Sequence, residues 1–369
     1  MSHTITKTLI QSITKALSTP PLFLCLFLST IAQSTTIIDP TQSFLTTGSN
    51  PRGVAFSPDG SLLVIPNMVN NTASVYTVTG TTITSAPSIN TGTAPYGVAF
   101  SPDGSLLVIT NLQSATASVY TVTGTTITSA GSITTGNFPH SVAFSPDGSL
   151  LVITNLSVNT ASVYTVTGTT FTPAPAIITG LNPVGVAFSP DGSLLVITNY
   201  GGTTASVYTV TATTITPAPA ITTGVGPAGV AFSPDGSLLV IANQVSDTAS
   251  VYTVTGTTIT VAGPINTGDQ PIGVAFSPDG SLLVIPNIVN NTASVYTVTG
   301  TTITPTNTIT TGTNPQFVAF SPYSPDGRSL LAISNGSSSG SQGASYYTVR
   351  SQVMGPLASA IRNKYLFKK

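Results

Sequence analysis

One phrase recurs through this chain at a fixed interval. Near copies of "VAFSPDGSLLVITN" (98–111) are spaced 44 residues apart, with their first valines at Val54, Val98, Val142, Val186, Val230, Val274 and Val318. A period of roughly 40 to 45 residues built from short apolar runs and turn residues is typical of a β-propeller, in which each repeat supplies one four-stranded blade. The sequence therefore predicts an all-β, seven-bladed β-propeller whose repeats start near residues 53, 97, 141, 185, 229, 273 and 317.

The second repeat shows the expected order of strands within a blade. "GVAFS" (97–101) reads as the innermost strand, and "PDG" as a tight turn, because Pro102 presets φ and Gly104 accepts positive φ. "SLLVIT" is an unbroken apolar run, as expected for a strand buried on both faces. "TASVYTV" and "TTITSAGSI" follow as the third and outer strands, joined by a "TGTT" turn.

The two ends of the repeat array predict how the ring closes. The seventh repeat has three strands but no "TGTTIT" segment after Val349. Upstream of the first repeat, "SFLTTGSNPRG" (43–53) matches the end of an outer strand and its exit loop, "SINTGTAPYG" (88–97). We therefore expect the N-terminal segment to supply the outer strand of the last blade, which removes the open sheet edges of a linear array.

The charged residues are few and unevenly placed. They make up 5% of the chain, against roughly 25% in ordinary globular domains. The chain has no Glu, and seven of its Asp residues stand in the repeated P-D-G turn: Asp59, Asp103, Asp147, Asp191, Asp235, Asp279 and Asp326. A short carboxylate in such a turn is expected to hydrogen-bond nearby backbone rather than a metal. No Lys occurs between Lys15 and Lys364, so no basic face for nucleic acid is expected.

The first and last segments differ from the repeats. Lys7 and Lys15 precede "PLFLCLFLSTIA" (21–32), the pattern of a signal peptide over residues 1–32 that is cleaved near Ala32. Its apolar stretch is too short to span a bilayer, which takes about 20 residues, so we expect no transmembrane segment in the mature chain. The lone Cys25 would leave with the signal. The propeller is expected over 33–349, followed by a basic tail over 350–369, and the protein is expected to be secreted or held at the cell surface or in the periplasm.

Comparison of the repeats with one another shows where they have diverged. The S-P-D-G and T-G-T-T turns hardly change, whereas the loops at the other end of the blades vary in every repeat. Variable loops on a rigid scaffold are a common design of binding proteins. The residues that follow the loop prolines are expected to ring the mouth of the central channel: Arg52, Tyr96, His140, Val184, Ala228, Ile272 and Gln316.

This expected ring has two unlike halves. Gln316, Arg52, Tyr96 and His140 are consecutive around the closed circle and polar, whereas the other three residues are apolar. A small or extended ligand with one polar or anionic end would suit such a mouth, with Arg52 making a bidentate contact. We therefore predict ligand binding at Arg52, Tyr96, His140 and Gln316.

The repeated residues also resemble a known family. "SPDGSLLVITN" followed by "TASVY" is similar to the YVTN-type repeat of surface-layer and YncE-like propellers, which are related to lactonase-type propellers. The resemblance covers about 43–349 and implies a propeller fold. The resemblance to lactonase-type propellers implies a central site that contains acidic, His and Arg side chains or a divalent metal. Here the loop acids Asp247 and Asp269 lie several blades from His140.

The inventory of side chains favours binding over catalysis. His140 is the one histidine left after signal removal, and a general base also needs an orienting partner, which the neighbouring sequence does not supply. We expect an exported, monomeric, non-catalytic binding or surface protein with no cofactor and no metal, whose partner is a small molecule, a glycan or a protein. The alternatives are a lactonase-like hydrolase and a self-associating component of the cell envelope.

Overall fold

The structure is a computed structural model that describes residues 35–336 and 343–352. Most of the described chain falls in one compact unit, Ile38–Val349, and the account below concerns that unit. The predicted signal peptide over residues 1–32 and nearly all of the predicted tail lie outside the described residues. The last strand, β30, runs on to Gln352 and so extends into the segment expected as tail.

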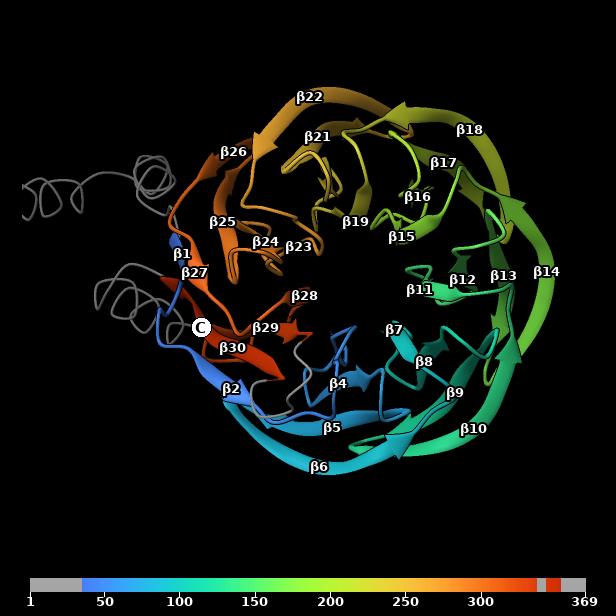
Figure 1. Cartoon of the computed structure of the whole chain (residues 1–369), viewed down its shortest axis with the longest axis horizontal. Helices are drawn as coiled ribbons and strands as arrows, with labels where there is room; N and C mark the ends of the chain where they lie inside the picture. The colour runs from blue at the N-terminus through green and yellow to red at the C-terminus, as the bar shows by residue number, and fades with distance from the viewer. Residues whose placement is uncertain (1–34, 337–342, 353–369) are drawn as a thin grey trace, which may run out of the picture. The chain divides into compact units, whose positions relative to one another are not determined.

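Seven antiparallel sheets stand around a central axis, one for each repeat (Figure 1). No helix occurs among the residues that the structure describes, and so none that could cross a bilayer. The all-β, seven-bladed propeller predicted from the 44-residue period is therefore confirmed.

The strands occupy four positions, from the axis outward. The innermost strands are β3 (Ala55–Phe56), β7 (Pro95–Phe100), β11 (Pro139–Phe144), β15 (Pro183–Phe188), β19 (Pro227–Phe232), β23 (Ala275–Phe276) and β28 (Pro315–Phe320). The second strands are β4 (Leu62–Asn67), β8 (Leu106–Asn111), β12 (Leu150–Asn155), β16 (Leu194–Asn199), β20 (Leu238–Asn243), β24 (Leu282–Asn287) and β29 (Arg328–Asn335).

The third strands are β5 (Thr72–Thr79), β9 (Thr116–Thr123), β13 (Thr160–Thr167), β17 (Thr204–Thr211), β21 (Thr248–Thr255), β25 (Thr292–Thr299) and β30 (Ala344–Gln352). The outer strands are β6 (Thr82–Asn90), β10 (Thr126–Thr134), β14 (Thr170–Ile178), β18 (Thr214–Thr222), β22 (Thr258–Asn266), the pair β26 (Thr302–Pro305) and β27 (Ile309–Thr310), and the pair β2 (Ser43–Leu45) and β1 (Thr35–Ile38).

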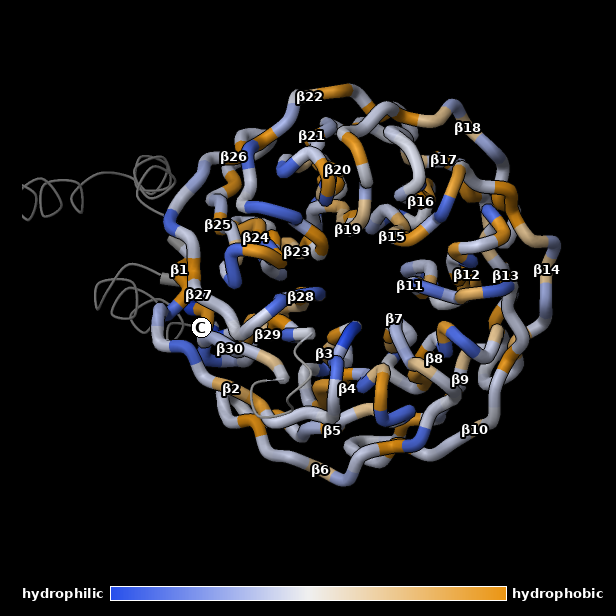
Figure 2. The backbone as a smooth tube through the Cα atoms, in the orientation of Figure 1, coloured by the Kyte–Doolittle hydropathy of each residue, from blue (hydrophilic) through white to orange (hydrophobic). Residues whose placement is uncertain are grey.

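The core lies between neighbouring blades. The six residues of each "LLVITN"-type strand, such as β16, are all buried, and Figure 2 shows hydrophobic residues gathered on β16, β20 and β24. The tyrosine of each third strand packs on the preceding blade. Tyr208 clusters with Leu150 and Val152, and its hydroxyl donates to the Ile178 carbonyl oxygen at 2.6 Å. Each interface thus combines buried apolar area with a satisfied polar group.

The first and last segments of the described chain close the ring. Strand β2 pairs antiparallel with β30, with Ser43 opposite Tyr346 and Leu45 opposite Ala344, and the two lie side by side in Figure 1. The predicted closure is confirmed by this pairing of β2 with β30.

Two blades have contracted innermost strands. Strands β3 and β23 span only two residues each, and their second strands contain Pro66 and Pro286 where other blades have Thr, Ala or Ser. Proline removes a backbone N–H from a strand and so interrupts its ladder. What remains near the loop end is a single bridge in each blade, such as Pro51 opposite Asn67.

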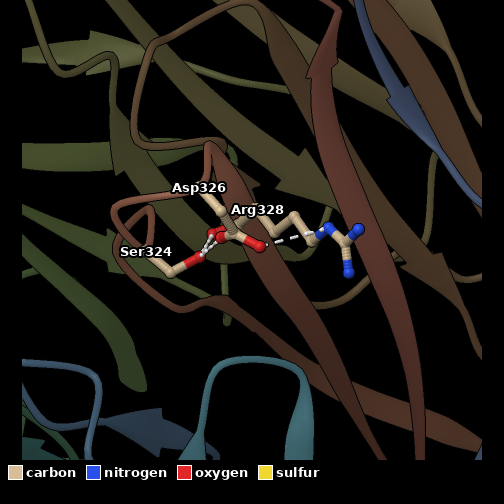
Figure 3. A network of polar contacts seen from close by, with 3 residues as sticks. All are labelled: Ser324, Asp326 and Arg328. Carbon is tan, nitrogen blue, oxygen red and sulfur yellow. Dashed lines mark hydrogen bonds and ion pairs between the residues drawn. The ribbon is translucent and has the colours of Figure 1, made fainter.

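The last blade carries an enlarged version of the S-P-D-G turn. Ser324 Oγ donates to Asp326, and Arg328 Nε lies 3.3 Å from an Asp326 carboxylate oxygen (Figure 3). Both charged side chains are largely exposed, so this ion pair adds little to stability. Its main effect is local, because it fixes the shape of a longer turn.

Candidate functional site

The two ends of the propeller differ in what their loops do. We call the end with the S-P-D-G and T-G-T-T turns the turn face. The end with the T-G-x-x-P loops, which enter the innermost strands, and the loops between second and third strands is called the loop face.

On the turn face, the carboxylate of each repeated Asp accepts hydrogen bonds from residues of its own turn. In the second blade, Asp103 Oδ1 accepts hydrogen bonds from Ser101 Oγ at 2.6 Å and from the Ser105 N–H at 3.0 Å. These bonds lower the pKa of Asp103. The Ser101 hydroxyl oxygen in turn accepts the Leu106 N–H at 2.9 Å. The turn-stabilising role expected for the repeated Asp is confirmed.

On the loop face, repeated side chains hold the backbone. Asn111 Nδ2 donates to Ser118 Oγ at 3.0 Å, and its Oδ1 accepts the Gly92 N–H at 3.0 Å, so this repeated Asn holds the loop backbone in place. Asn71 Oδ1 accepts the Ala94 N–H of the next blade at 2.9 Å. The residue before each loop proline has a left-handed φ between 52° and 66°: Asn50, Ala94, Phe138, Asn182, Gly226, Gln270 and Asn314.

This fixed backbone aims the residue after each proline at the axis. All seven of these residues line one cavity of about 360 Å³, together with several neighbours from the same face. We call it the mouth cavity; it is lined by Arg52, Tyr96, His140, Ser141, Leu156, Val184, Gly185, Tyr200, Ala228, Gly229, Gln244, Ile272, Ile288, Gln316 and Phe317. Its volume lies in the usual range for small-molecule sites, about 300 to 1,000 Å³.

The structure brings the four predicted site residues into one continuous run. Arg52 Nη1 donates to Gln316 Oε1 at 2.7 Å, across the junction between the first and last blades. The Arg52 guanidinium carbon lies 5.5 Å from the centre of the Tyr96 ring. The Tyr96 and His140 ring centres are 4.1 Å apart, with 41° between the ring planes. Arg52 Nε is buried and has no hydrogen-bond partner among the described residues.

Burial sets the charge of this run. It lowers the pKa of His140 to about 4, and the nearby Arg52 charge lowers the pKa further, whereas a hydrogen bond to the Val184 backbone opposes the shift. Burial also raises the pKa of Tyr96, and Arg52 opposes that rise. At neutral pH the imidazole and the phenol are therefore both uncharged. Among the lining residues, Arg52 is left as the one charged side chain.

Eight of the fifteen lining residues were not predicted from the sequence, and two of these eight depart from the repeat pattern. Ser141 and Phe317 stand where the other blades have Gly53, Gly97, Gly185, Gly229 and Gly273. A Cβ at Gly97 would lie 2.5 Å from the His140 carbonyl oxygen, which explains the preference for glycine. Ser141 Oγ lies 3.2 Å from His140 Nδ1, and Phe317 meets Tyr96 edge to face at 5.7 Å between ring centres. The sequence did contain a sign of both residues, because this position is glycine in the other five repeats and only Ser141 and Phe317 differ.

Carboxylates take no part in the mouth cavity. No Asp is among its lining residues. The loop acids are engaged elsewhere, because Asp247 Oδ1 accepts the Gln270 N–H at 2.8 Å and Asp269 contacts Asn290. Within the described ranges, no three His, Cys or Asp side chains come together as potential metal ligands.

Comparisons with known proteins agree with this architecture. The family model described as lactonase, 7-bladed beta-propeller, matches residues 81–176 and 139–320. No curated protein sequence matches the chain. The lactonase part of the resemblance noted in the sequence is thereby supported, whereas none of these matches bears on its YVTN-type part.

Three solved structures show how broadly the fold is shared. A putative 6-phosphogluconolactonase from Bacteroides fragilis has 18% identity and a TM-score of 0.67, covering 73% of this chain and 86% of its own. The periplasmic gluconolactonase of Pseudomonas aeruginosa has 18% identity and a TM-score of 0.62, covering 73% and 87%. Kuenenia stuttgartiensis hydrazine synthase has 19% identity and a TM-score of 0.65, covering 85% and 99%. At such identities, the likeness concerns the fold alone.

Proposed function

Because this chain belongs to the family of lactonase seven-bladed β-propellers, we propose that it binds a small lactone in the mouth cavity and opens the ring by hydrolysis. The observation that carries the proposal is the contact run Gln316–Arg52–Tyr96–His140, which places one cation beside one uncharged imidazole in a concave site. The proposal uses the binding site that was predicted from the sequence. It differs from the sequence-based expectation in assigning catalysis to that site.

Each member of the run has a chemical role in this proposal. The Arg52 guanidinium lines the cavity, and its charge-assisted N–H donors suit a carbonyl or carboxylate oxygen of the ligand. His140 is uncharged above about pH 4 and accepts a proton from the attacking water. The water's hydroxyl adds to the lactone carbonyl carbon, the ring C–O bond breaks, and the released alkoxide takes the proton from the imidazolium. Ser141, beside His140 Nδ1, helps to orient the ring.

A second candidate function is ligand binding without turnover, the leading interpretation of the sequence. It is favoured by the acid-free lining of the mouth cavity, which leaves His140 with a hydroxyl and a backbone group as neighbours instead of a carboxylate. An imidazole with a pKa near 4 is also a weak base. Both candidates use the same cavity and the same cation, so one experiment separates them.

The experiment measures binding and turnover on the same protein. Purified residues 33–369 are titrated with γ-butyrolactone, δ-gluconolactone and their hydroxy acids by calorimetry, and ring opening is followed by acid release. Turnover that is lost in His140→Gln, with binding retained, supports hydrolysis. Binding with no turnover supports the non-catalytic alternative, and neither binding nor turnover overturns both. Asp147→Asn on the turn face is the matched control, because that residue lies outside the cavity lining.

We also propose that the protein acts outside the cytoplasm, as the pattern over residues 1–32 predicts. The gluconolactonase-like structural neighbour from Pseudomonas aeruginosa is described as periplasmic, which is compatible with this location. Sequencing the N-terminus of the protein recovered from the culture medium and envelope fractions tests the proposal. A product that begins near Gln33 supports export, whereas a chain that keeps Met1 and stays in the cytosolic fraction contradicts it.

A further inference from the structure

The wall of the mouth cavity opposite Arg52 is mainly apolar, with Gln244 as its one amide side chain. It is built from the residues after the loop prolines of the fourth, fifth and sixth blades and from their neighbours in adjacent loops: Val184, Ala228, Ile272, Leu156, Tyr200 and Ile288. Such a wall gains free energy by contact with hydrocarbon and offers few partners to a hydroxylated ligand. The cavity therefore distinguishes two ends of whatever it holds.

The apolar wall continues outward onto the rim of the loop face. Leu181 is 59% exposed in the loop of Val184, and Val225 is 48% exposed in the loop of Ala228. Tyr200 belongs to both regions, because it lines the cavity and also remains partly exposed. Exposed apolar side chains that adjoin a concave apolar site are typical of binding surfaces.

The charge of the cavity limits the polar end of the ligand. Arg52 is the one charged lining residue, and it already donates a hydrogen bond to Gln316. A phosphate dianion needs several charge-assisted donors, but an ester carbonyl or a carboxylate can be satisfied by one guanidinium. The cavity is therefore poorly suited to a phosphorylated sugar lactone.

From these three observations, we infer that the mouth cavity takes an amphiphilic lactone. Its ester head, or the carboxylate formed on hydrolysis, lies against Arg52 and Gln316, and an alkyl or aryl body lies against Val184, Ala228 and Ile272. The lactone part of this inference rests on the proposed function. The two-ended recognition rests on the cavity itself and holds for simple carboxylates as well.

The test is a series of ligands with increasing chain length. Binding of γ-butyrolactone, γ-hexalactone, γ-octalactone and γ-decalactone is measured by calorimetry, beside δ-gluconolactone and 6-phosphogluconolactone. Affinity is expected to rise about fourfold for each added methylene until the wall is covered. Tighter binding of either sugar lactone, or a flat series, overturns the inference and leaves lactone hydrolysis standing.

A second series tests the same recognition without any lactone. Butanoate, hexanoate, octanoate and decanoate present a carboxylate to Arg52 and an alkyl chain to the wall, and they cannot be hydrolysed. If no lactone binds, a chain-length dependence among these carboxylates still supports the two-ended cavity. Its absence overturns the inference.

Paired variants locate the effect in the wall. Ile272→Asn is expected to flatten the chain-length dependence of both series, because it places an amide where the alkyl body lies. Val261→Asn is the matched control, since Val261 is 65% exposed on outer strand β22, away from the cavity. Equal slopes in the wild-type protein and Ile272→Asn contradict the proposed placement of the alkyl body.

Discussion

The turn face and the loop face share one backbone plan in almost every blade, but they use their polar side chains differently. On the turn face, Ser101 and Ser105 satisfy the carboxylate of Asp103, and the same arrangement recurs in neighbouring blades. On the loop face, side chains such as Asn111 satisfy the backbone of the loops. The polar side chains of the turn face therefore stabilise the turns themselves. On the loop face, other side chains remain directed toward the axis.

The difference explains why the loop face could diversify. Because Asn71 and its counterparts hold the loop N–H groups, most of the loops do not depend on the side chain of the residue after the proline. Gln316 is an exception, since its Nε2 donates to Asn314 Oδ1 of the same loop at 2.6 Å. Such positions accept changes of charge and size at small cost in stability. Arg52, His140 and Ile272 occupy equivalent sites, yet they give the mouth cavity a cation, an imidazole and an apolar wall.

Opening the ring should have the largest effect and should damage both faces together. Deleting residues 33–47 removes β1 and β2, exposes the edge of β30, and takes buried Leu45 from its cluster. We expect a loss of more than about 5 kcal/mol in the free energy of unfolding, with aggregation through the free edge. Thermal unfolding and light scattering measure these effects. An unchanged melting temperature would show that the closure is dispensable.

Replacing the imidazole should separate activity from stability. Under the proposed hydrolysis, His140→Gln is expected to lower kcat/KM by roughly 100-fold or more, with little change in melting temperature. Because burial lowers the pKa of His140 from 6.5 to about 4, the acid limb of activity should lie near pH 4. Stability should also fall as the pH drops from 6.5 toward 4, since the unfolded chain takes up the proton first. A limb near pH 6.5 contradicts this assignment.

A pair of charge-removing variants compares the two faces directly. Arg52→Ala is expected to weaken binding of a carboxylate or lactone by about 1.5 to 3 kcal/mol, at least tenfold, without unfolding the protein. Asp147→Asn should do the reverse, costing about 1 to 2 kcal/mol of stability through weakened bonds from Ser145 and Ser149 while affinity is kept. Calorimetry and chemical denaturation give both quantities. Loss of affinity in Asp147→Asn alone would assign binding to the turn face.

The smallest expected effect concerns an irregular turn on the turn face. Ala212 has a left-handed φ of 51° where the corresponding turn of the third blade has Gly168 at 56°. Ala212→Gly should therefore raise the free energy of unfolding by about 0.5 to 1 kcal/mol, and Gly168→Ala should lower it by a similar amount. Chemical denaturation of both variants measures the difference. A destabilised Ala212→Gly would indicate that the alanine methyl group makes a favourable contact.

The sequence predicted the parts of the molecule that depend on periodicity. The repeat spacing gave the blade number and the strand order, and the missing outer strand predicted the pairing of β2 with β30. It also selected Arg52, Tyr96, His140 and Gln316 as neighbours around the axis, and the structure places all four in one cavity wall. Position in a repeat fixes such placements because every blade copies the same backbone.

The repeat pattern did not predict which individual side-chain atoms would be in contact. The hydrogen bond from Arg52 to Gln316 joins residues 264 positions apart, and it depends on rotamers that no repeat pattern encodes. The approach of Ser141 Oγ to His140 Nδ1 joins two consecutive residues, but it likewise depends on their rotamers. The contracted strands β3 and β23 likewise follow from single prolines, whose effect on the ladder appears only when the partner strand is known.

The strand pairing that closes the ring also sets the order in which the chain can fold. The side chains of Gln42 and Ser345 are hydrogen-bonded although they stand 303 positions apart. Contacts of such long sequence separation form late and slow folding, since the entropy of closing the loop is lost before the contact is gained. Until the final repeat is in place, a partly folded chain presents an open edge beside blades of nearly identical sequence. Copies folding at high concentration are therefore exposed to exchange of that strand between molecules.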